Sequence, residues 1–194
     1  FNIVKLSAGE RFVSTVEGYE TCLVPATGAI DVQIGDWSAD GVGGRGEDVW
    51  DGEPNAVYVP VGAAAEMTAV TDCEVFIAGA AFDEVYAPFV VGAGDIDPVQ
   101  YGSDDTKTHR KIKHLLGQNP PGKVGRLLVS ELYTVGAGGW SGFPPHKHDT
   151  DNLPEESYLE ETYYHRVNPP QGYVLHRVYD DSRKLDETMA AEDR

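Results

Sequence analysis

Residues 55–62 read Asn55-Ala-Val-Tyr-Val-Pro-Val-Gly62, and residues 69–77 read Ala69-Val-Thr-Asp-Cys-Glu-Val-Phe-Ile77. Both segments are short, rich in β-branched and aromatic residues, and bounded by turn formers, which is typical of β-strands. We predict a hairpin over residues 55–62 with a tight Pro-x-Gly turn, followed by paired strands. Similar segments recur at Arg126–Val135 and Tyr173–Tyr179.

The wider sequence favours an all-β fold. Its 22 glycines and 12 prolines fall between short apolar stretches, and such stretches at a spacing of about 8–12 residues indicate successive strands. Only Thr108–Leu116 predicts a helical turn. Strands without intervening helices favour an antiparallel sandwich or barrel over a βαβ fold.

The two halves of the chain follow a similar plan. A polar stretch, Ile96–Lys107, separates them, so we predict one domain over residues 1–102 and a second over residues 103–194. The paired strands of the first half have no equivalent after Tyr179. We therefore expect the second half to end before its closing strands, as a truncated domain would.

Composition excludes two classes of partner. The chain has 15 Lys and Arg against 32 Asp and Glu, a formal net charge of −17, and this surplus of carboxylates repels nucleic acid. The longest apolar run, Ala56–Ala65, is interrupted by Pro60 and Gly62 and falls short of the roughly 18 residues that a membrane helix needs. We expect neither nucleic acid nor a membrane as partner.

The cysteines and the first residues bear on location. Cys22 and Cys73 are too few for a disulfide framework, so we predict two buried thiols in a reducing compartment. The sequence starts at Phe1 without an initiator Met or a charged-then-apolar leader. We therefore expect a cytoplasmic protein.

The strongest chemical signal is Gly142-Phe-Pro-Pro-His-Lys-His148. On an extended strand alternate side chains share a face, so His146 and His148 would point the same way and Lys147 the opposite way. Their Cα atoms would lie about 7 Å apart, at twice the strand rise. Two such imidazoles can bind one divalent ion, provided that neighbouring strands supply further ligands.

Residues 161–167, Glu161-Thr-Tyr-Tyr-His-Arg-Val167, are predicted as the next strand. Alternation then places Glu161, Tyr163 and His165 on one face, and Glu161 is the best carboxylate ligand. The other acidic residues between 149 and 160 are predicted as solvated loop.

The remaining histidines have less specific interpretations. We favour a half-buried strand residue over a metal ligand for His165, and more strongly so for His114 and His176. His109 lies in the basic cluster 108–113, where a solvated face is favoured over contact with an anionic substrate.

Four segments in the second half match a known family: Pro144-Pro-His-Lys-His-Asp-Thr-Asp-Asn152, Tyr158-Leu-Glu-Glu-Thr-Tyr-Tyr-His-Arg166, Asn168-Pro-Pro-Gln-Gly172 and Leu185-Asp-Glu-Thr-Met189. They closely resemble the 5-deoxy-glucuronate isomerases of inositol catabolism. That family consists of cupins related to the 4-deoxy-5-threo-hexosulose-uronate ketol-isomerases of pectin breakdown. The likeness is looser over residues 1–105.

The resemblance implies a bicupin, with two jelly-roll β-domains of which the second binds a divalent metal such as zinc, manganese or iron. By position, His146, His148 and Glu161 take three ligand roles, and the fourth ligand, a later His, is expected beyond residue 194. The first half lacks His-x-His and resembles a metal-free structural copy.

The resemblance also implies an activity, the conversion of 5-deoxy-D-glucuronate to 2-deoxy-5-keto-D-gluconate in myo-inositol catabolism. We offer Tyr163 or His165 as the base for this aldose–ketose isomerisation. Candidates to bind the substrate carboxylate are Arg166, Arg177 and Lys147, although alternation places Arg166 and Lys147 on the outer face. The partner is then a small sugar acid, and a homo-oligomer stays open.

Two alternatives remain at this stage, because cupin folds host many functions. One is a non-enzymatic cupin that binds a sugar or a metal. The other is an iron-dependent cupin dioxygenase, which also uses two His and one carboxylate with open coordination positions.

Overall fold

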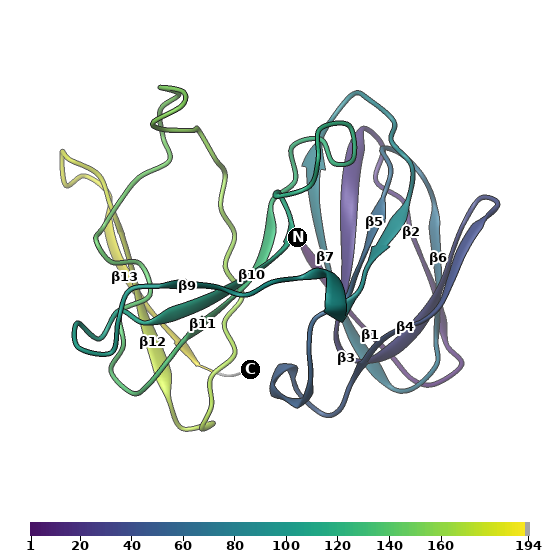
Figure 1. Cartoon of the computed structure of the whole chain (residues 1–194), viewed down its shortest axis with the longest axis horizontal. Helices are drawn as coiled ribbons and strands as arrows, with labels where there is room; N and C mark the ends of the chain where they lie inside the picture. Colours follow the sequence, from purple (N-terminus) through teal and green to yellow (C-terminus); the bar gives the residue numbers. More distant parts are fainter. Residues whose placement is uncertain (193–194) are drawn as a thin grey trace. The chain divides into compact units, whose positions relative to one another are not determined.

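The computed structural model describes residues 1–192, and all of its extended regular structure is β (Figure 1). The strands are β1 (Asn2–Leu6), β2 (Arg11–Ser14), β3 (Tyr19–Ile34), β4 (Trp37–Arg45), β5 (Ala56–Val59), β6 (Ala65–Ala69), β7 (Cys73–Ala81), β8 (Phe89–Val91), β9 (Val99–Tyr101), β10 (Arg110–Leu116), β11 (Val129–Thr134), β12 (Tyr173–Tyr179) and β13 (Asp186–Glu192). Two short 3-10 turns, η1 (Val49–Asp51) and η2 (Ala93–Asp95), interrupt them. The predicted all-β class is confirmed.

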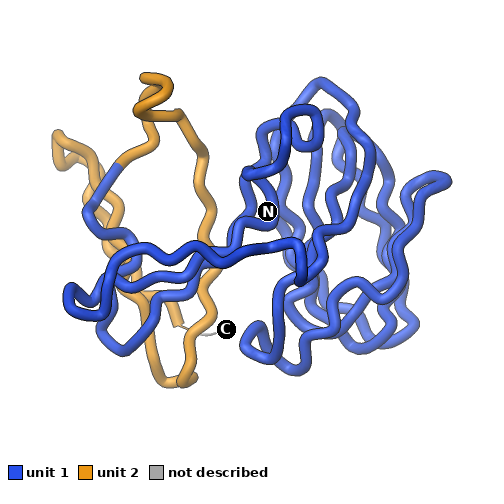
Figure 2. Tube along the Cα trace, in the orientation of Figure 1, with its two compact units in different colours: residues 1–146 blue, residues 147–194 orange. Residues whose placement is uncertain are grey.

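The chain divides into two compact units, residues 1–146 and residues 147–194 (Figure 2). This division differs from the predicted domains, 1–102 and 103–194, because β10 and β11, which follow residue 102, belong to the first unit. Leu115, Leu116 and Leu127 are buried in one apolar cluster with Cys22 and Tyr58. The division into two cupin domains remains a prediction.

The long strand β3 organises the first unit. Its first part pairs with β5 and β7, and its second part pairs with β4 and β6. Register shifts between Pro25 and Thr27 and between Gly28 and Ala29 mark the place where β3 changes partners, as bulges do in strands that bend. Gly28 has φ +65°, and a Cβ there would lie 2.2 Å from the Asp72 carbonyl oxygen. No other residue fits this crossing without a backbone shift.

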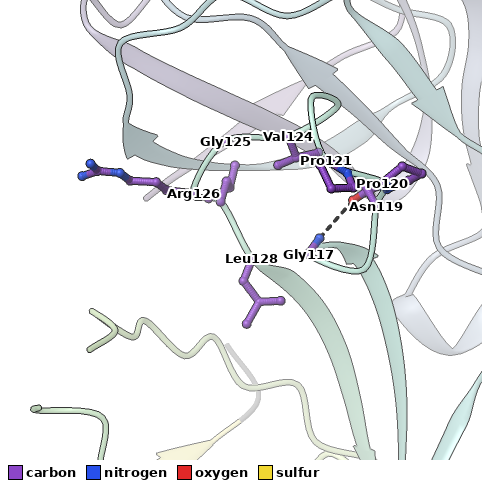
Figure 3. Close-up of a pocket in the computed structure, with 9 residues that line it drawn as sticks. Gly117, Asn119, Pro120, Pro121, Val124, Gly125, Arg126 and Leu128 are labelled. Atoms are coloured by element: carbon purple, nitrogen blue, oxygen red, sulfur yellow. Dashed lines mark hydrogen bonds between the residues drawn. The ribbon is translucent and has the colours of Figure 1, made fainter. Parts of the chain in front are cut away.

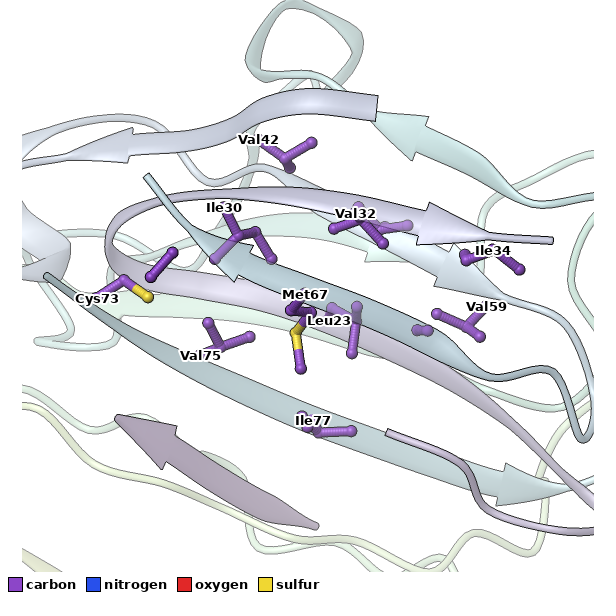
Figure 4. Close-up of a cluster of buried hydrophobic side chains, with 13 residues drawn as sticks. Leu23, Ile30, Val32, Ile34, Val42, Val59, Met67, Cys73, Val75 and Ile77 are labelled. Carbon is purple, nitrogen blue, oxygen red and sulfur yellow. The ribbon is translucent and has the colours of Figure 1, made fainter. Parts of the chain in front are cut away.

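The main core lies between the strands that β3 connects (Figure 4). Leu23 and Ile30 from the two parts of β3 are fully buried, together with Met67 from β6 and Val75 from β7. Each such side chain contributes about 1.5–3 kcal/mol when it leaves water. The core therefore stabilises the crossing of β3.

A separate antiparallel sheet follows in the first unit, with strand order β11-β10-β9. The predicted helical turn over Thr108–Leu116 is wrong, because β10 covers Arg110–Leu116. A helix this short is marginal by itself. As a strand, the segment gains hydrogen-bond ladders on both sides, to β9 and to β11.

The predicted hairpin over residues 55–62 is also wrong, although its turn is correct. The N–H of Ala63 donates to the Pro60 carbonyl over 3.1 Å, and Gly62 has φ +66°. However, β5 pairs with β3 and β8, so neither of its edges is open to β6. The turn joins strands that have different partners.

The second unit contains an antiparallel hairpin of β12 and β13, with Tyr173 opposite Glu192 and Tyr179 opposite Asp186. A paired strand therefore does follow Tyr179, contrary to expectation. Two parallel hydrogen bonds of 2.7 Å from Arg177 to Asp186 reinforce the hairpin.

Residues 161–167 form no strand, and neither do residues 142–148. Pro144 and Pro145 have no backbone N–H to donate to a neighbouring strand, which explains why residues 142–148 form no strand. Residues 161–167 have a strand-like sequence but pair with no neighbouring strand among residues 1–192, and whether such a sequence forms a strand depends on this context.

Both cysteines of the chain, Cys22 and Cys73, are free and buried, as predicted. In residues 1–192, no helix has the length and hydropathy that crossing a bilayer requires.

Candidate active site

His146 ends the first unit, in an exposed irregular segment. Its Nδ1 lies 3.0 Å from the carbonyl oxygen of Pro144. A carbonyl oxygen only accepts hydrogen bonds, so Nδ1 carries the proton and, in the neutral ring, Nε2 carries the lone pair. This is the tautomer that binds a metal through Nε2.

The second unit brings together Glu161, Tyr163 and His165. The Tyr163 hydroxyl donates to Glu161 Oε1 over 3.1 Å. The rings of Tyr163 and His165 are nearly parallel, with centroids 6.2 Å apart. The predicted proximity of these three side chains is therefore present, although the strand that was to produce it is not.

His176 joins this group from β12. Its ring meets Tyr163 edge-on at 5.0 Å and His165 edge-on at 5.8 Å. It is half-buried on a strand, as expected, but its place beside Tyr163 and His165 was not predicted. The contact joins residues of different segments, and no local pattern indicates it.

The surroundings keep two of these rings uncharged near neutral pH. Burial and the nearby His176 lower the pKa of His165. Burial, the Glu161 charge and the hydrogen bond to Glu161 raise the pKa of Tyr163 to about 12. A neutral imidazole can accept a proton and a phenol can donate one. His165 can therefore act as a proton acceptor and Tyr163 as a proton donor.

The basic candidates for substrate binding have protein partners. Lys147 Nζ lies 2.8 Å from Asp149 and 3.2 Å from Glu156. Arg177 pairs with Asp186, and the Arg166 guanidinium lies 5.8 Å from the ring centre of Tyr164.

The other histidines also have local partners. His109 Nδ1 lies 2.8 Å from Asp104, and His114 Nδ1 lies 2.8 Å from the Ser130 hydroxyl. Neither belongs to the group around Tyr163.

A pocket of about 250 Å³ lies in the first unit, on the loop between β10 and β11 (Figure 3). Its lining residues include Gly117, Asn119, Pro120, Arg126 and Leu128. It contains none of the predicted site residues.

The model of the KduI/IolB family matches residues 1–194. The chain belongs to the KduI/IolB family. The family recognised from the motifs of the second half is thereby confirmed.

Relatives in the KduI/IolB family carry a functional name. The 5-deoxy-glucuronate isomerase of Bacillus velezensis is 39% identical over 193 residues, which is 99% of this chain and 69% of that protein. The 5-deoxy-glucuronate isomerase of Bacillus subtilis strain 168 is 38% identical over 97% of this chain and 68% of its own length. The crystal structure of an IolB-like protein from Salmonella typhimurium LT2 matches with a TM-score of 0.88 and 35% identity, covering 99% of this chain and 71% of that one.

The donor set of this KduI/IolB member suits a divalent ion, since two imidazoles and one carboxylate are common ligands of zinc, manganese and iron. Throughout residues 1–192, however, no three or more His, Cys, Asp or Glu side chains are grouped closely enough to hold one. His146 belongs to the first unit, whereas His148 and Glu161 belong to the second. The metal assignment of these three residues therefore stays a prediction from the sequence.

Proposed function

We propose that this chain carries out the metal-dependent aldose–ketose isomerisation of 5-deoxy-D-glucuronate to 2-deoxy-5-keto-D-gluconate, in the catabolism of myo-inositol in the cytoplasm. The observation that supports it most is the match to 5-deoxy-glucuronate isomerases along nearly the whole chain. We further propose a bicupin fold, with a metal-free first domain and a metal-binding second domain. The partner is a small sugar acid, with no role for nucleic acid or membrane.

The reaction moves one proton between neighbouring carbons and one between oxygens, so it needs a base and a proton donor. We assign these roles to His165 and Tyr163, whose rings stack at 6.2 Å. Glu161 accepts a hydrogen bond from the Tyr163 hydroxyl and so fixes the direction in which that hydroxyl points.

His146, His148 and Glu161 would hold the divalent ion. When bound, the ion would supply Lewis-acid stabilisation of the negative charge that develops on the sugar oxygens. The Nδ1 contact of His146 to Pro144 supports this role, because it presents Nε2 as the ligating nitrogen.

Chelation tests the proposal. Removal of metal should abolish conversion of 5-deoxy-D-glucuronate, and addition of zinc, manganese or iron should restore it. Full activity of a verified metal-free preparation would refute the metal dependence.

Substitution tests the residues. His148→Ala should lower the bound metal content, whereas Glu155→Gln, in the exposed loop nearby, should leave it unchanged. His165→Gln should lower kcat and retain metal. Oxygen consumption would instead indicate a dioxygenase, and saturable sugar binding without turnover would indicate a binding protein.

A further inference from the structure

We propose that His176 is a substrate-binding residue, whose imidazole forms a hydrogen bond with an oxygen of the sugar acid beside Tyr163 and His165. This inference rests on the proposed function, in which Tyr163 and His165 transfer the protons of that substrate. All three side chains belong to the second unit. The role of His176 is independent of the metal ligands.

The rings of Tyr163, His165 and His176 form one cluster. His176 meets Tyr163 edge-on at 5.0 Å and His165 edge-on at 5.8 Å, and the rings of Tyr163 and His165 lie nearly parallel at 6.2 Å. Each ring centre is thus within 6.2 Å of the other two. A small molecule that touches both proposed proton-transfer groups is therefore within reach of His176.

The imidazole nitrogens of this cluster are available for further hydrogen bonds. Glu161 accepts the hydrogen bond of the Tyr163 hydroxyl. In the part of the chain that the structure describes, however, no hydrogen bond joins the ring nitrogens of His165 or His176 to another residue, and none of these nitrogens is sealed from solvent. Since polar groups inside proteins are normally hydrogen-bonded, half-buried imidazoles of this kind can serve a ligand.

The cluster is accessible to a small molecule. Tyr163 is 54% exposed, and Met189, which lies opposite His176 on β13, is 53% exposed. The side chains of His165 and His176 are half-buried beside them. A ligand can therefore reach His176 at a place partly shielded from water, where a hydrogen bond is stronger than in bulk solvent.

The chemistry of imidazole suits a sugar acid. A neutral imidazole offers one N–H donor and one nitrogen acceptor, and the protonated ring offers two donors. In either state His176 can donate to a hydroxyl, carbonyl or carboxylate oxygen, which are the oxygens that a sugar acid presents. A hydrogen bond of this kind selects against a ligand that lacks the oxygen.

Two substitutions separate hydrogen bonding from ring packing. His176→Phe keeps an aromatic ring beside Tyr163 and His165 but has no nitrogen, so the KM for 5-deoxy-D-glucuronate should rise about 10-fold with kcat nearly unchanged. His176→Gln loses the ring but keeps an N–H donor, so its KM should rise less. Leu175→Gln is the matched control. Leu175 is exposed on the opposite face of β12, and its substitution should leave KM unchanged.

Binding is measured without turnover by isothermal titration calorimetry of the slow variant His165→Gln with 5-deoxy-D-glucuronate. Addition of His176→Phe to this variant should weaken binding by the same factor of about 10. Unchanged KM and affinity on substitution by Phe would overturn the proposal. A larger loss with Gln than with Phe would also overturn it, because His176 would then act through the packing of its ring.

Failure of the proposed function gives a different result. If the unsubstituted protein does not convert 5-deoxy-D-glucuronate, the isomerase activity is refuted, and the calorimetry alone then decides whether His176 binds the sugar acid. Absence of both conversion and binding would refute the proposed function and the role of His176 together.

Discussion

Arg45 and Glu131 form a two-point ion pair within the first unit, with Nη1–Oε1 and Nη2–Oε2 distances of 2.6 Å each. The Arg45 side chain is 1% exposed and that of Glu131 is 19% exposed. The Tyr133 hydroxyl donates to the same carboxylate over 2.6 Å. This pair connects β4, which is hydrogen-bonded to β3, with β11. It therefore connects the sheet built around β3 to the sheet of β9, β10 and β11, which precedes His146 in the chain.

Arg45→Met should destabilise the protein by about 3 kcal/mol, because removal of one partner leaves a largely buried carboxylate without its countercharge. Urea unfolding measures the change. The double variant Arg45→Met with Glu131→Leu should lose less than the sum of the two single changes. Strict additivity would show that the pair is not coupled.

Substitution of the buried Glu20 should also lower the stability of the protein. Its fully buried carboxylate accepts from the backbone N–H groups of Gly125, Arg126 and Leu127 and from the Tyr58 hydroxyl, over 2.6–2.9 Å. Glu20→Gln turns an NH2 group toward two of these donors, and each unsatisfied buried donor costs about 1–3 kcal/mol. We expect a loss of at least about 2 kcal/mol in urea unfolding.

Tyr58→Phe is the matched comparison for Glu20. It removes one donor and leaves no N–H without an acceptor, so its cost should be about 1 kcal/mol. An equal cost for both substitutions would contradict this account of the carboxylate.

Local patterns predicted several of the strands but not their partners. The segments that became β5, β7, β11 and β12 were recognised from their β-branched and aromatic residues, and the turn after β5 from Pro60 and Gly62. The choice of β3 and β8 as neighbours of β5 depends on residues far away in the sequence. The same holds for β10, which has strand geometry because β9 and β11 flank it.

In the candidate site, too, local sequence predicts some contacts and tertiary packing determines the others. Glu161, Tyr163 and His165 are spaced two residues apart, so an extended backbone suffices to place them together. His176 approaches Tyr163 and His165 from β12, and only tertiary packing determines that contact. The hydrogen bonds of Arg110 could not be predicted either, since its acceptors are backbone carbonyls about thirty residues away, and carbonyls carry no sequence signature.

The two cysteines should be unreactive in the folded protein. Cys22 is 0% exposed and Cys73 is 6% exposed, and burial raises the pKa of both thiols, which depletes the reactive thiolate. A thiol reagent such as iodoacetamide should label neither residue in native buffer and both in urea. Rapid labelling of the native protein would contradict the burial of these side chains.

His165 should make stability depend on pH. Its pKa is lowered in the folded state by burial and by His176, so below the ordinary value of about 6.5 the unfolded chain binds more protons at this site. Stability therefore falls as the pH drops from about 6.5 through the lowered pKa, and above 6.5 the residue has no effect. His165→Gln should flatten this part of the urea midpoint profile between pH 7.5 and pH 5. If the urea midpoints of the two proteins changed with pH in parallel, the pKa of His165 would be the same in the folded and the unfolded state, contrary to this prediction.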